Sequence, residues 1–236
     1  MARKFEERVL EREGVRLRIL VWPGDLDTLP VVFLPGFLGP PESYDVEAAY
    51  LAPRNVAALG LRGSPGSDCP PSGWRADDFY DDLVFLIEHL GYPRFFLSAY
   101  SANVPLALRY AAGHSERLAG LVLIDYGPEQ PAARPAWAVQ LRDRLPEDAL
   151  RAFLREFMGY DAAPLLERVR TPVLLLRGDP EEGSLLSEAD AQVMRERLPN
   201  VCEQVFPNAG HEVWEPEPHT YIEALAGFFT EVERRS

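Results

Sequence analysis

Short, continuously apolar runs recur along this chain of 236 residues, and amphipathic stretches separate them. A run without polar alternation is typical of a strand that is buried on both faces. Strands of this kind are predicted at residues 30–34, 55–59, 94–99, 119–125, 171–177 and 201–206. Helices are predicted at residues 74–90, 102–112, 187–198 and 219–232. The alternation predicts an α/β fold with a mostly parallel central sheet flanked by helices.

The N-terminal part of the chain has a different pattern. Residues 6–10 and 16–21 flank the turn signal Glu13-Gly14 and are predicted to form a hairpin. The chain length and a hydrophobic content of 47% suit one large α/β domain, so we expect residues 1–236 to form a single domain.

Residues 127–167 interrupt the alternation. This segment contains several prolines and helical stretches such as residues 150–157, and nothing in it is predicted to be a strand. It follows the sixth predicted strand, so it is expected to lie over the carboxyl ends of the strands, where ligands bind in open α/β sheets. We interpret it as a helical lid insertion. The alternative is a packed helical excursion with no gating role.

Ser101 stands where a predicted strand runs directly into a predicted helix. A serine in such a tight turn presents its hydroxyl at the top of the sheet, which is the nucleophile-elbow arrangement of serine hydrolases. The consensus is Gly-x-Ser-x-Gly, whereas residues 99–103 read Ala-Tyr-Ser-Ala-Asn, so both glycines are replaced. The alternative interpretation of Ser101 is an ordinary helix N-cap.

A serine nucleophile needs a base, and His211 is the preferred candidate among four histidines. It lies in the loop between the last predicted strand and the last predicted helix, where it is free to point at Ser101. His89, His114 and His219 are expected to be structural or surface residues.

Four segments of the chain resemble the motifs of the α/β-hydrolase fold family, in the family's order. They are residues 34–39 (an oxyanion loop), 61–67 (the Arg-Gly loop after the fourth strand), 99–103 (the elbow) and 209–211 (the Gly-His pair). The similarity runs from about Pro30 to the C-terminus. It implies an oxyanion hole formed by the N–H groups of Phe37 and Ala102, the latter aided by its place at a helix N-terminus.

The acid of a catalytic triad is left open between two residues. Asp125 ends the sixth predicted strand, where some family members place their acid, and Glu181 follows the seventh, where many have an aspartate. Asp179 does not stand at the position after the seventh predicted strand where the family's acid is found. Asp125 is preferred because a triad usually uses aspartate. A bracing carboxylate is the alternative role for Asp125.

These observations predict a serine hydrolase of a small, rather apolar ester, thioester or related acyl compound, with no metal and no cofactor. Ser101, His211 and Asp125 would form the triad. Two alternatives remain: a non-catalytic ligand-binding or signalling protein, motivated by the altered elbow, and a cofactor-free lyase or carbon–carbon hydrolase that uses the same triad. Haloalkane dehalogenation is not expected, because it needs a carboxylate where this chain has Ser101.

Composition limits the partners. The net charge of −13 disfavours nucleic acid and anionic membrane surfaces. The first eight residues are rich in charge and lack the apolar stretch of a signal peptide. No apolar run approaches the ~20 residues of a membrane span. Two cysteines make no disulfide framework. We therefore expect a cytoplasmic protein. The aromatic and apolar residues of the insertion could line an acyl pocket or pack the insertion onto the core. They are Trp137, Phe153, Phe157, Met158 and Tyr160.

Overall fold

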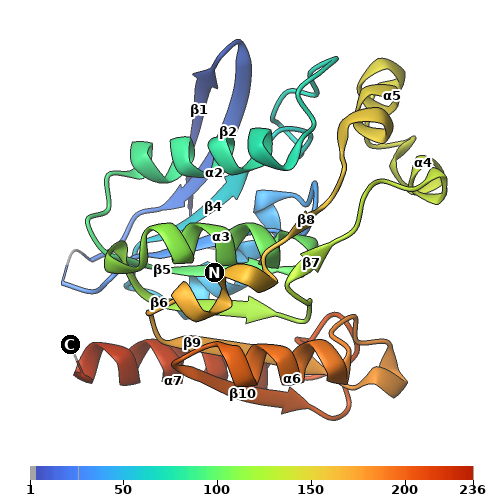
Figure 1. Cartoon of the computed structure of the whole chain (residues 1–236). Helices are drawn as coiled ribbons and strands as arrows, with labels where there is room; N and C mark the ends of the chain where they lie inside the picture. Colours follow the sequence, from blue (N-terminus) through green and yellow to red (C-terminus); the bar gives the residue numbers. More distant parts are fainter. Residues whose placement is uncertain (1–3, 26, 236) are drawn as a thin grey trace.

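The computed structural model describes residues 4–25 and 27–235 and contains an eight-stranded sheet in the order β1-β2-β4-β3-β5-β6-β9-β10 (Figure 1). Its strands are β1 (Glu6–Arg12), β2 (Val15–Trp22), β3 (Val31–Leu34), β4 (Val56–Gly60), β5 (Phe95–Tyr100), β6 (Leu118–Ile124), β9 (Val173–Gly178) and β10 (Val201–Phe206). β2 pairs antiparallel with both β1 and β4, and all other neighbours pair parallel. The predicted α/β-hydrolase fold class is confirmed.

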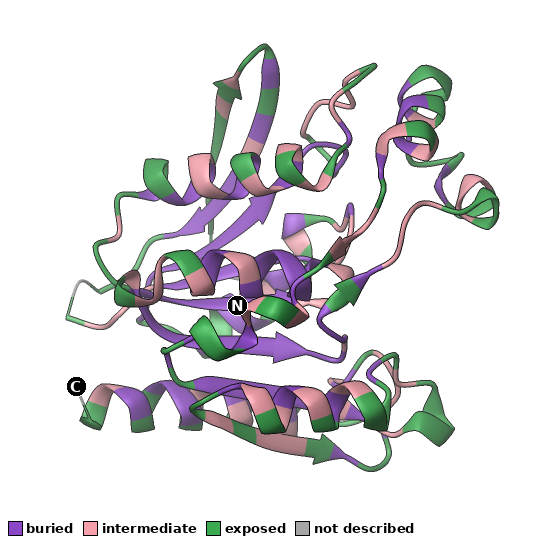
Figure 2. Ribbon diagram, viewed as in Figure 1, coloured by how far each residue is buried: buried purple, intermediate pink, exposed green. Residues whose placement is uncertain are grey.

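Helices cover both faces of the sheet. The α-helices are α1 (Asp45–Tyr50), α2 (Ala76–Leu90), α3 (Val104–Gly113), α4 (Pro135–Leu141), α5 (Glu147–Glu156), α6 (Glu188–Arg197) and α7 (Pro218–Arg235). Buried side chains of α2, α3 and α6 pack on one face, and those of α1 and α7 pack on the other. Figure 2 shows the central strands almost entirely buried between these layers.

The continuous apolar runs have a direct structural explanation. In β3, Val32 and Leu34 contribute to the core under α2 and α3, whereas Val31 and Phe33 contribute to the core under α1 and α7. All four side chains are fully buried. Because successive side chains of a strand point to opposite faces, a strand between two helical layers needs apolar residues at every position.

The N-terminal hairpin is present as predicted: β1 and β2 pair in register across Glu13 and Gly14, which both have positive φ. The segment η1 (Pro41–Tyr44) followed by α1 was not predicted. Its elements are four and six residues long, and the first begins at Pro41, so no long helical period marks them.

The inserted segment forms an arm that carries α4 and α5 away from the sheet (Figure 1). The expectation that it contains no strand is wrong, because β7 (Glu129–Gln130) and β8 (Tyr160–Asp161) pair antiparallel at its base. Two-residue strands leave no apolar run in the sequence. The segment ends with η4 (Ala163–Arg168) before β9.

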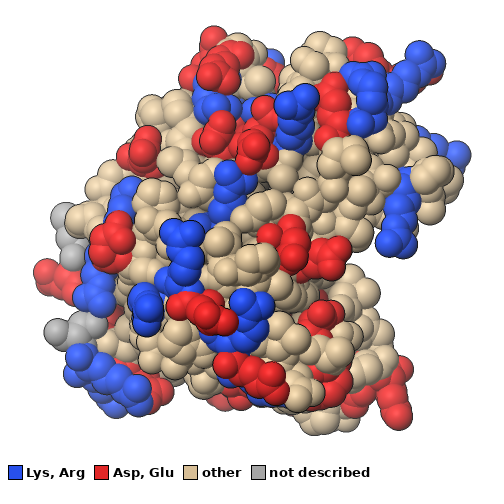
Figure 3. Space-filling view, viewed as in Figure 1, with Lys and Arg blue, Asp and Glu red and all other residues tan. Residues whose placement is uncertain are grey.

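Within the described residues, no helix combines the length and the apolarity that crossing a membrane requires. The prediction about the N-terminal segment rests partly on residues 1–3, which lie outside the described residues. Figure 3 shows acidic and basic side chains interspersed over the face in view.

Candidate active site

Five loops meet at the edge of the sheet where its parallel strands end. They follow β3, β5, β6, β9 and β10, and they contain Phe37, Ser101, Asp125, residues 179–187 and His211 respectively. Parallel strands bring their carboxyl ends to the same edge, so residues more than a hundred positions apart become neighbours here.

Ser101, His211 and Asp125 form one continuous hydrogen-bonded chain. The Nε2 atom of His211 lies 2.8 Å from Oγ of Ser101, and its Nδ1 atom lies 2.9 Å from Oδ2 of Asp125. The imidazole is about one quarter exposed, whereas the carboxylate is fully buried. This geometry allows the imidazole to accept the serine proton while the carboxylate holds its orientation.

Asp125 is fixed by the loop that follows β9. Its Oδ1 accepts hydrogen bonds from the N–H of Gly178 (3.0 Å) and the hydroxyl of Ser184 (2.5 Å). The N–H of Leu185 donates to Oδ2 (2.8 Å). Burial by itself raises the pKa of Asp125, but the hydrogen bonds from His211 and from these loop groups outweigh it and hold the pKa below its usual value. The carboxylate is therefore ionised at neutral pH.

The turn at Ser101 is strained in the way that an elbow requires. Ser101 has φ of 58°, in the left-handed region that non-glycine residues seldom adopt. Gly36 faces this turn, and a Cβ atom at that position would lie 3.0 Å from the ring of Tyr100. The ring of Tyr100 also stacks on the imidazole of His211 with centroids 4.7 Å apart.

The asparagine that replaces the second elbow glycine has a structural role. Asn103 has φ of −93°, so its backbone does not need glycine. Its buried side-chain amide donates a hydrogen bond of 2.7 Å to the carbonyl of Pro35. The elbow and the loop after β3 are thus tied together by Asn103.

The loop after β3 is braced at two further points. The N–H of Gly39 donates to the carbonyl of Gly36 (2.6 Å), and Leu38 has φ of 55°. Arg144, from the inserted segment, donates to the carbonyl of Leu38. The N–H of Phe37 donates no hydrogen bond within the described residues, and Ala102 follows Ser101 at the start of the helical segment that leads into α3. Sequence reasoning did not identify Arg144, since its contact spans more than a hundred positions.

Close backbone approach holds the loop of His211. A Cβ atom on Gly178 would lie 2.0 Å from the carbonyl oxygen of Gly210, and one on Gly210 would lie 2.2 Å from that of Glu182. The N–H of Asp179 donates to the carbonyl of Ala209 (2.7 Å). Glycine is required at both positions because only hydrogen fits between the two loops.

The remaining acid and histidine candidates lie apart from the chain of hydrogen bonds. Glu181 is exposed in the short turn η5 (Pro180–Glu182), where its N–H donates to Asp179 (2.8 Å). His89 contacts the carbonyl of Phe85, and His219 contacts the hydroxyl of Tyr50. His114 stacks on Tyr110 at the end of α3.

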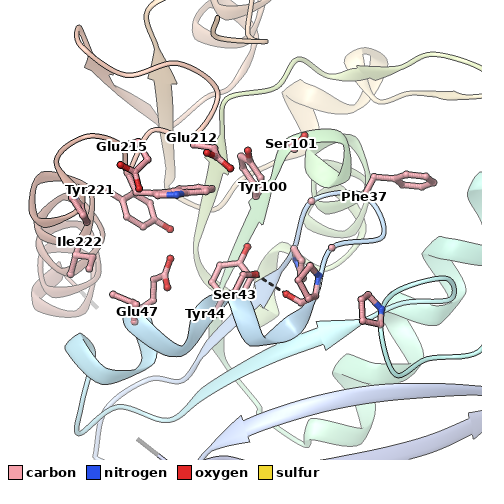
Figure 4. A pocket seen from close by; sticks show the side chains of 18 of the residues that line it. Phe37, Ser43, Tyr44, Glu47, Tyr100, Ser101, Glu212, Glu215, Tyr221 and Ile222 are labelled. Carbon is pink, nitrogen blue, oxygen red and sulfur yellow. Dashed lines mark hydrogen bonds between the residues drawn. The ribbon is translucent and has the colours of Figure 1, made fainter. Parts of the chain in front are cut away.

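A cavity of about 860 Å³ opens beside Ser101. Figure 4 shows it between the loop after β3, the segment η1–α1 and the start of α7. Its lining includes Ser101, Tyr100, Trp214, Tyr44, Glu47 and Tyr221. The ring of Phe37 points away from the cavity.

The aromatic residues of the inserted segment mostly pack with one another. The rings of Trp137, Phe153 and Phe157 surround Phe37 at centroid distances of 5.4–6.1 Å, and Phe153 is fully buried. Met158 is 77% exposed. None of the five aromatic and apolar residues singled out in this segment lines the cavity beside Ser101. The packing interpretation therefore fits Trp137, Phe153 and Phe157.

Among residues 4–25 and 27–235, no group of three or more histidine, cysteine or acidic side chains is placed to hold a metal ion. Cys69 and Cys202 are both free thiols.

Residues 30–157 match the model of the alpha/beta hydrolase fold family, so the chain belongs to that family. A relative from Mesorhizobium japonicum, 2-(acetamidomethylene)succinate hydrolase, is 26% identical over 72% of this chain and 77% of its own length. Among solved structures, E-2-(acetamidomethylene)succinate hydrolase superposes with a TM-score of 0.74 at 20% identity, over 96% of this chain and 100% of that one. The esterase RhEst1 from Rhodococcus sp. ECU1013 superposes with a TM-score of 0.79 at 18% identity, over 97% and 99%.

Proposed function

We propose that this protein is a serine hydrolase that cleaves a small, rather apolar ester, thioester or related acyl compound. The observation that carries the proposal is the unbroken hydrogen-bonded chain from Ser101 through His211 to Asp125, which lies beside a cavity at the sheet edge. Membership in a family with hydrolase relatives supports the same conclusion.

The reaction follows from this geometry. Oγ of Ser101 attacks the acyl carbon while Nε2 of His211 takes its proton. The negative oxygen of the tetrahedral intermediate is held by the N–H groups of Phe37 and Ala102. His211 then donates the proton to the leaving group, which departs as an alcohol or thiol. Water, deprotonated by the same imidazole, attacks the acyl-serine ester and releases the acid with Ser101 restored.

Two features of the inserted segment make it the proposed lid. Arg144 reaches from it to the carbonyl of Leu38 in the proposed oxyanion loop, and Trp137 packs on the ring of Phe37. Movement of the segment would therefore change both the cover of the site and the support of an oxyanion donor.

The cavity beside Ser101 is a poor match for the substrate named for the Mesorhizobium relative. That substrate is a succinate, which bears two carboxylates. In the part of the chain that the structure describes, the cavity beside Ser101 is lined by Glu47, Glu212 and Glu215 and by a single arginine, Arg144. Like charges repel in a confined site, so a dicarboxylate fits this lining poorly.

The test is hydrolysis of p-nitrophenyl acetate and p-nitrophenyl butyrate by the wild type and by Ser101→Ala. We expect kcat/KM to fall by about 10³-fold or more in the variant, because the nucleophile is lost. A variant that retains the wild-type rate would refute the role of Ser101. The alternative of a non-catalytic binding protein predicts no turnover in either protein, with ligand-induced thermal stabilisation that survives the substitution.

A further inference from the structure

A buried carboxyl group lies in the cavity wall on the side opposite Ser101. In Figure 4, Ser101 and Tyr100 lie on one side of the cavity, and Glu47 and Tyr221 lie on the other. Glu47 comes from α1 and is 7% exposed, although it lines the cavity. The proposed triad does not use it.

Among the residues that the structure describes, no cation lies beside Glu47. No ion pair within the described residues includes this side chain, and no arginine or lysine contributes to its electrostatic surroundings. A buried carboxylate without a cation is costly, so such groups are found paired or are kept protonated. Burial raises the pKa of Glu47 to about 7, which leaves it ready to ionise when a cation arrives.

A second polar group at the same wall, the hydroxyl of Tyr221, interacts with the carboxyl group of Glu47. The side chain of Tyr221 is 1% exposed, and within the described residues its hydroxyl has no side-chain hydrogen-bond partner other than Glu47. Figure 4 shows it directed toward the carboxyl group of Glu47 at the cavity surface. The hydroxyl and the carboxyl group therefore form one buried polar pair at the cavity wall, and no cation of the described residues completes it.

The rest of the lining favours a positive group over a negative one. Glu212 and Glu215 add two further carboxylates, and Arg144, the one arginine that the described residues contribute to the lining, already donates to a backbone carbonyl. Tyr100 and Trp214 also line the cavity, and the ring of Trp214 contacts those of Tyr100 (centroids 4.9 Å apart) and Tyr221 (5.7 Å). Aromatic rings attract cations as well as apolar chains.

We infer that this wall binds the protonated amine of an acyl group whose carbonyl lies at Ser101. The ammonium group donates hydrogen bonds to the carboxylate of Glu47 and to the hydroxyl oxygen of Tyr221, and its methylene chain lies along Tyr100 and Trp214. The substrate class is therefore an ester or related derivative of an amino acid whose amine is separated from the carbonyl by a short apolar chain. This inference rests on the proposed hydrolase function.

The test compares esters that differ only in charge at the far end. The ammonium esters are p-nitrophenyl 6-aminohexanoate and 8-aminooctanoate, and the matched neutral esters are the heptanoate and nonanoate, in which a methyl group replaces the ammonium. We expect the ratio of kcat/KM, ammonium over neutral, to fall by about tenfold or more in Glu47→Gln, since a buried charge pair is lost. Glu223→Gln, which removes an exposed carboxylate of α7, should keep the wild-type ratio.

An unchanged ratio in Glu47→Gln would show a structural buried carboxyl only and would overturn the inference. Thermal unfolding of the variant establishes that it folds. Tyr221→Phe, which removes only the hydroxyl, gives a second measurement of the same ratio and should lower it in the same direction.

A binding measurement separates this inference from the proposed function. Calorimetric titration of Ser101→Ala with methyl 6-aminohexanoate and methyl heptanoate requires no turnover. We expect the ammonium ester to bind about tenfold or more tightly to Ser101→Ala than to the double variant that also carries Glu47→Gln. Equal affinities would overturn the amine site even if esters are hydrolysed. If the ammonium ester binds more tightly to Ser101→Ala than to the double variant, but the wild type hydrolyses no ester, the amine site would be supported and the hydrolase function refuted.

Discussion

Asp125→Asn is expected to lower kcat/KM for p-nitrophenyl butyrate by about 10⁴-fold, the size of effect seen when a triad aspartate becomes an amide. The amide cannot stabilise the imidazolium that forms on His211, and its N–H₂ group favours the wrong tautomer of the ring. Initial rates at neutral pH measure the effect. The carboxylate of Asp125 lies 2.9 Å from Nδ1 of His211 and is fully buried, so water cannot replace it.

Glu181→Gln is the matched control for this prediction. Glu181 was the competing candidate, and it is exposed in η5. Its variant should hydrolyse the ester at close to the wild-type rate. A large loss in Glu181→Gln together with a small loss in Asp125→Asn would reverse the assignment of the acid.

Arg62→Met is expected to destabilise the fold by about 3–5 kcal/mol, because it leaves a buried carboxylate without its main partner. Arg62 and Asp82 form a two-pronged ion pair, with Nε–Oδ2 and Nη2–Oδ1 distances of 2.7 Å. The side chains are 4% and 0% exposed. Arg12 is the only other cation on Asp82 within the described residues, at 3.5 Å, and it cannot take the place of both hydrogen bonds. Urea unfolding at neutral pH measures the loss.

Two further variants define the cause of that loss. Arg151→Met breaks an exposed pair with Glu147 and should leave the unfolding midpoint nearly unchanged. The double substitution Arg62→Met with Asp82→Leu removes both buried charges and should recover most of the stability lost in Arg62→Met. If the double variant is no more stable than Arg62→Met, the loss comes from packing and not from an unpaired charge.

The sheet was largely predictable because its strands lie between two helical layers. A strand buried on both faces must be apolar throughout, and this requirement makes β3, β5, β6 and β9 visible in the sequence. β10 has a weaker pattern because it is an edge strand with partly exposed residues. The elements η1 and α1 were missed since they are too short to show a period, yet they carry Tyr44 and Glu47 into the cavity.

The site was predictable in part. The turn context of Ser101 and the loop position of His211 pointed to the two residues that the structure brings within hydrogen-bond distance. The choice between Asp125 and Glu181 was not decidable from the sequence, because it depends on where the loop after β9 returns. That loop places Gly178, Ser184 and Leu185 around Asp125, and those contacts span 53–60 positions.

The altered elbow illustrates a limit of motif comparison. Asparagine at position 103 differs from the consensus and motivated the alternative of a non-catalytic protein. In the structure, its amide holds the carbonyl of Pro35, and its φ is negative. Whether a departure from a motif weakens a site depends on contacts between distant segments, which the motif itself does not contain.

Mass spectrometry after treatment with a fluorophosphonate probe tests the central claim most directly. An activated serine attacks the phosphorus and displaces fluoride, which leaves a stable covalent adduct. We expect a single adduct per chain, located on the peptide that contains Ser101 and absent from Ser101→Ala and His211→Ala. A protein that gains no adduct, or that is labelled at another residue to the same extent in Ser101→Ala, would contradict the central claim.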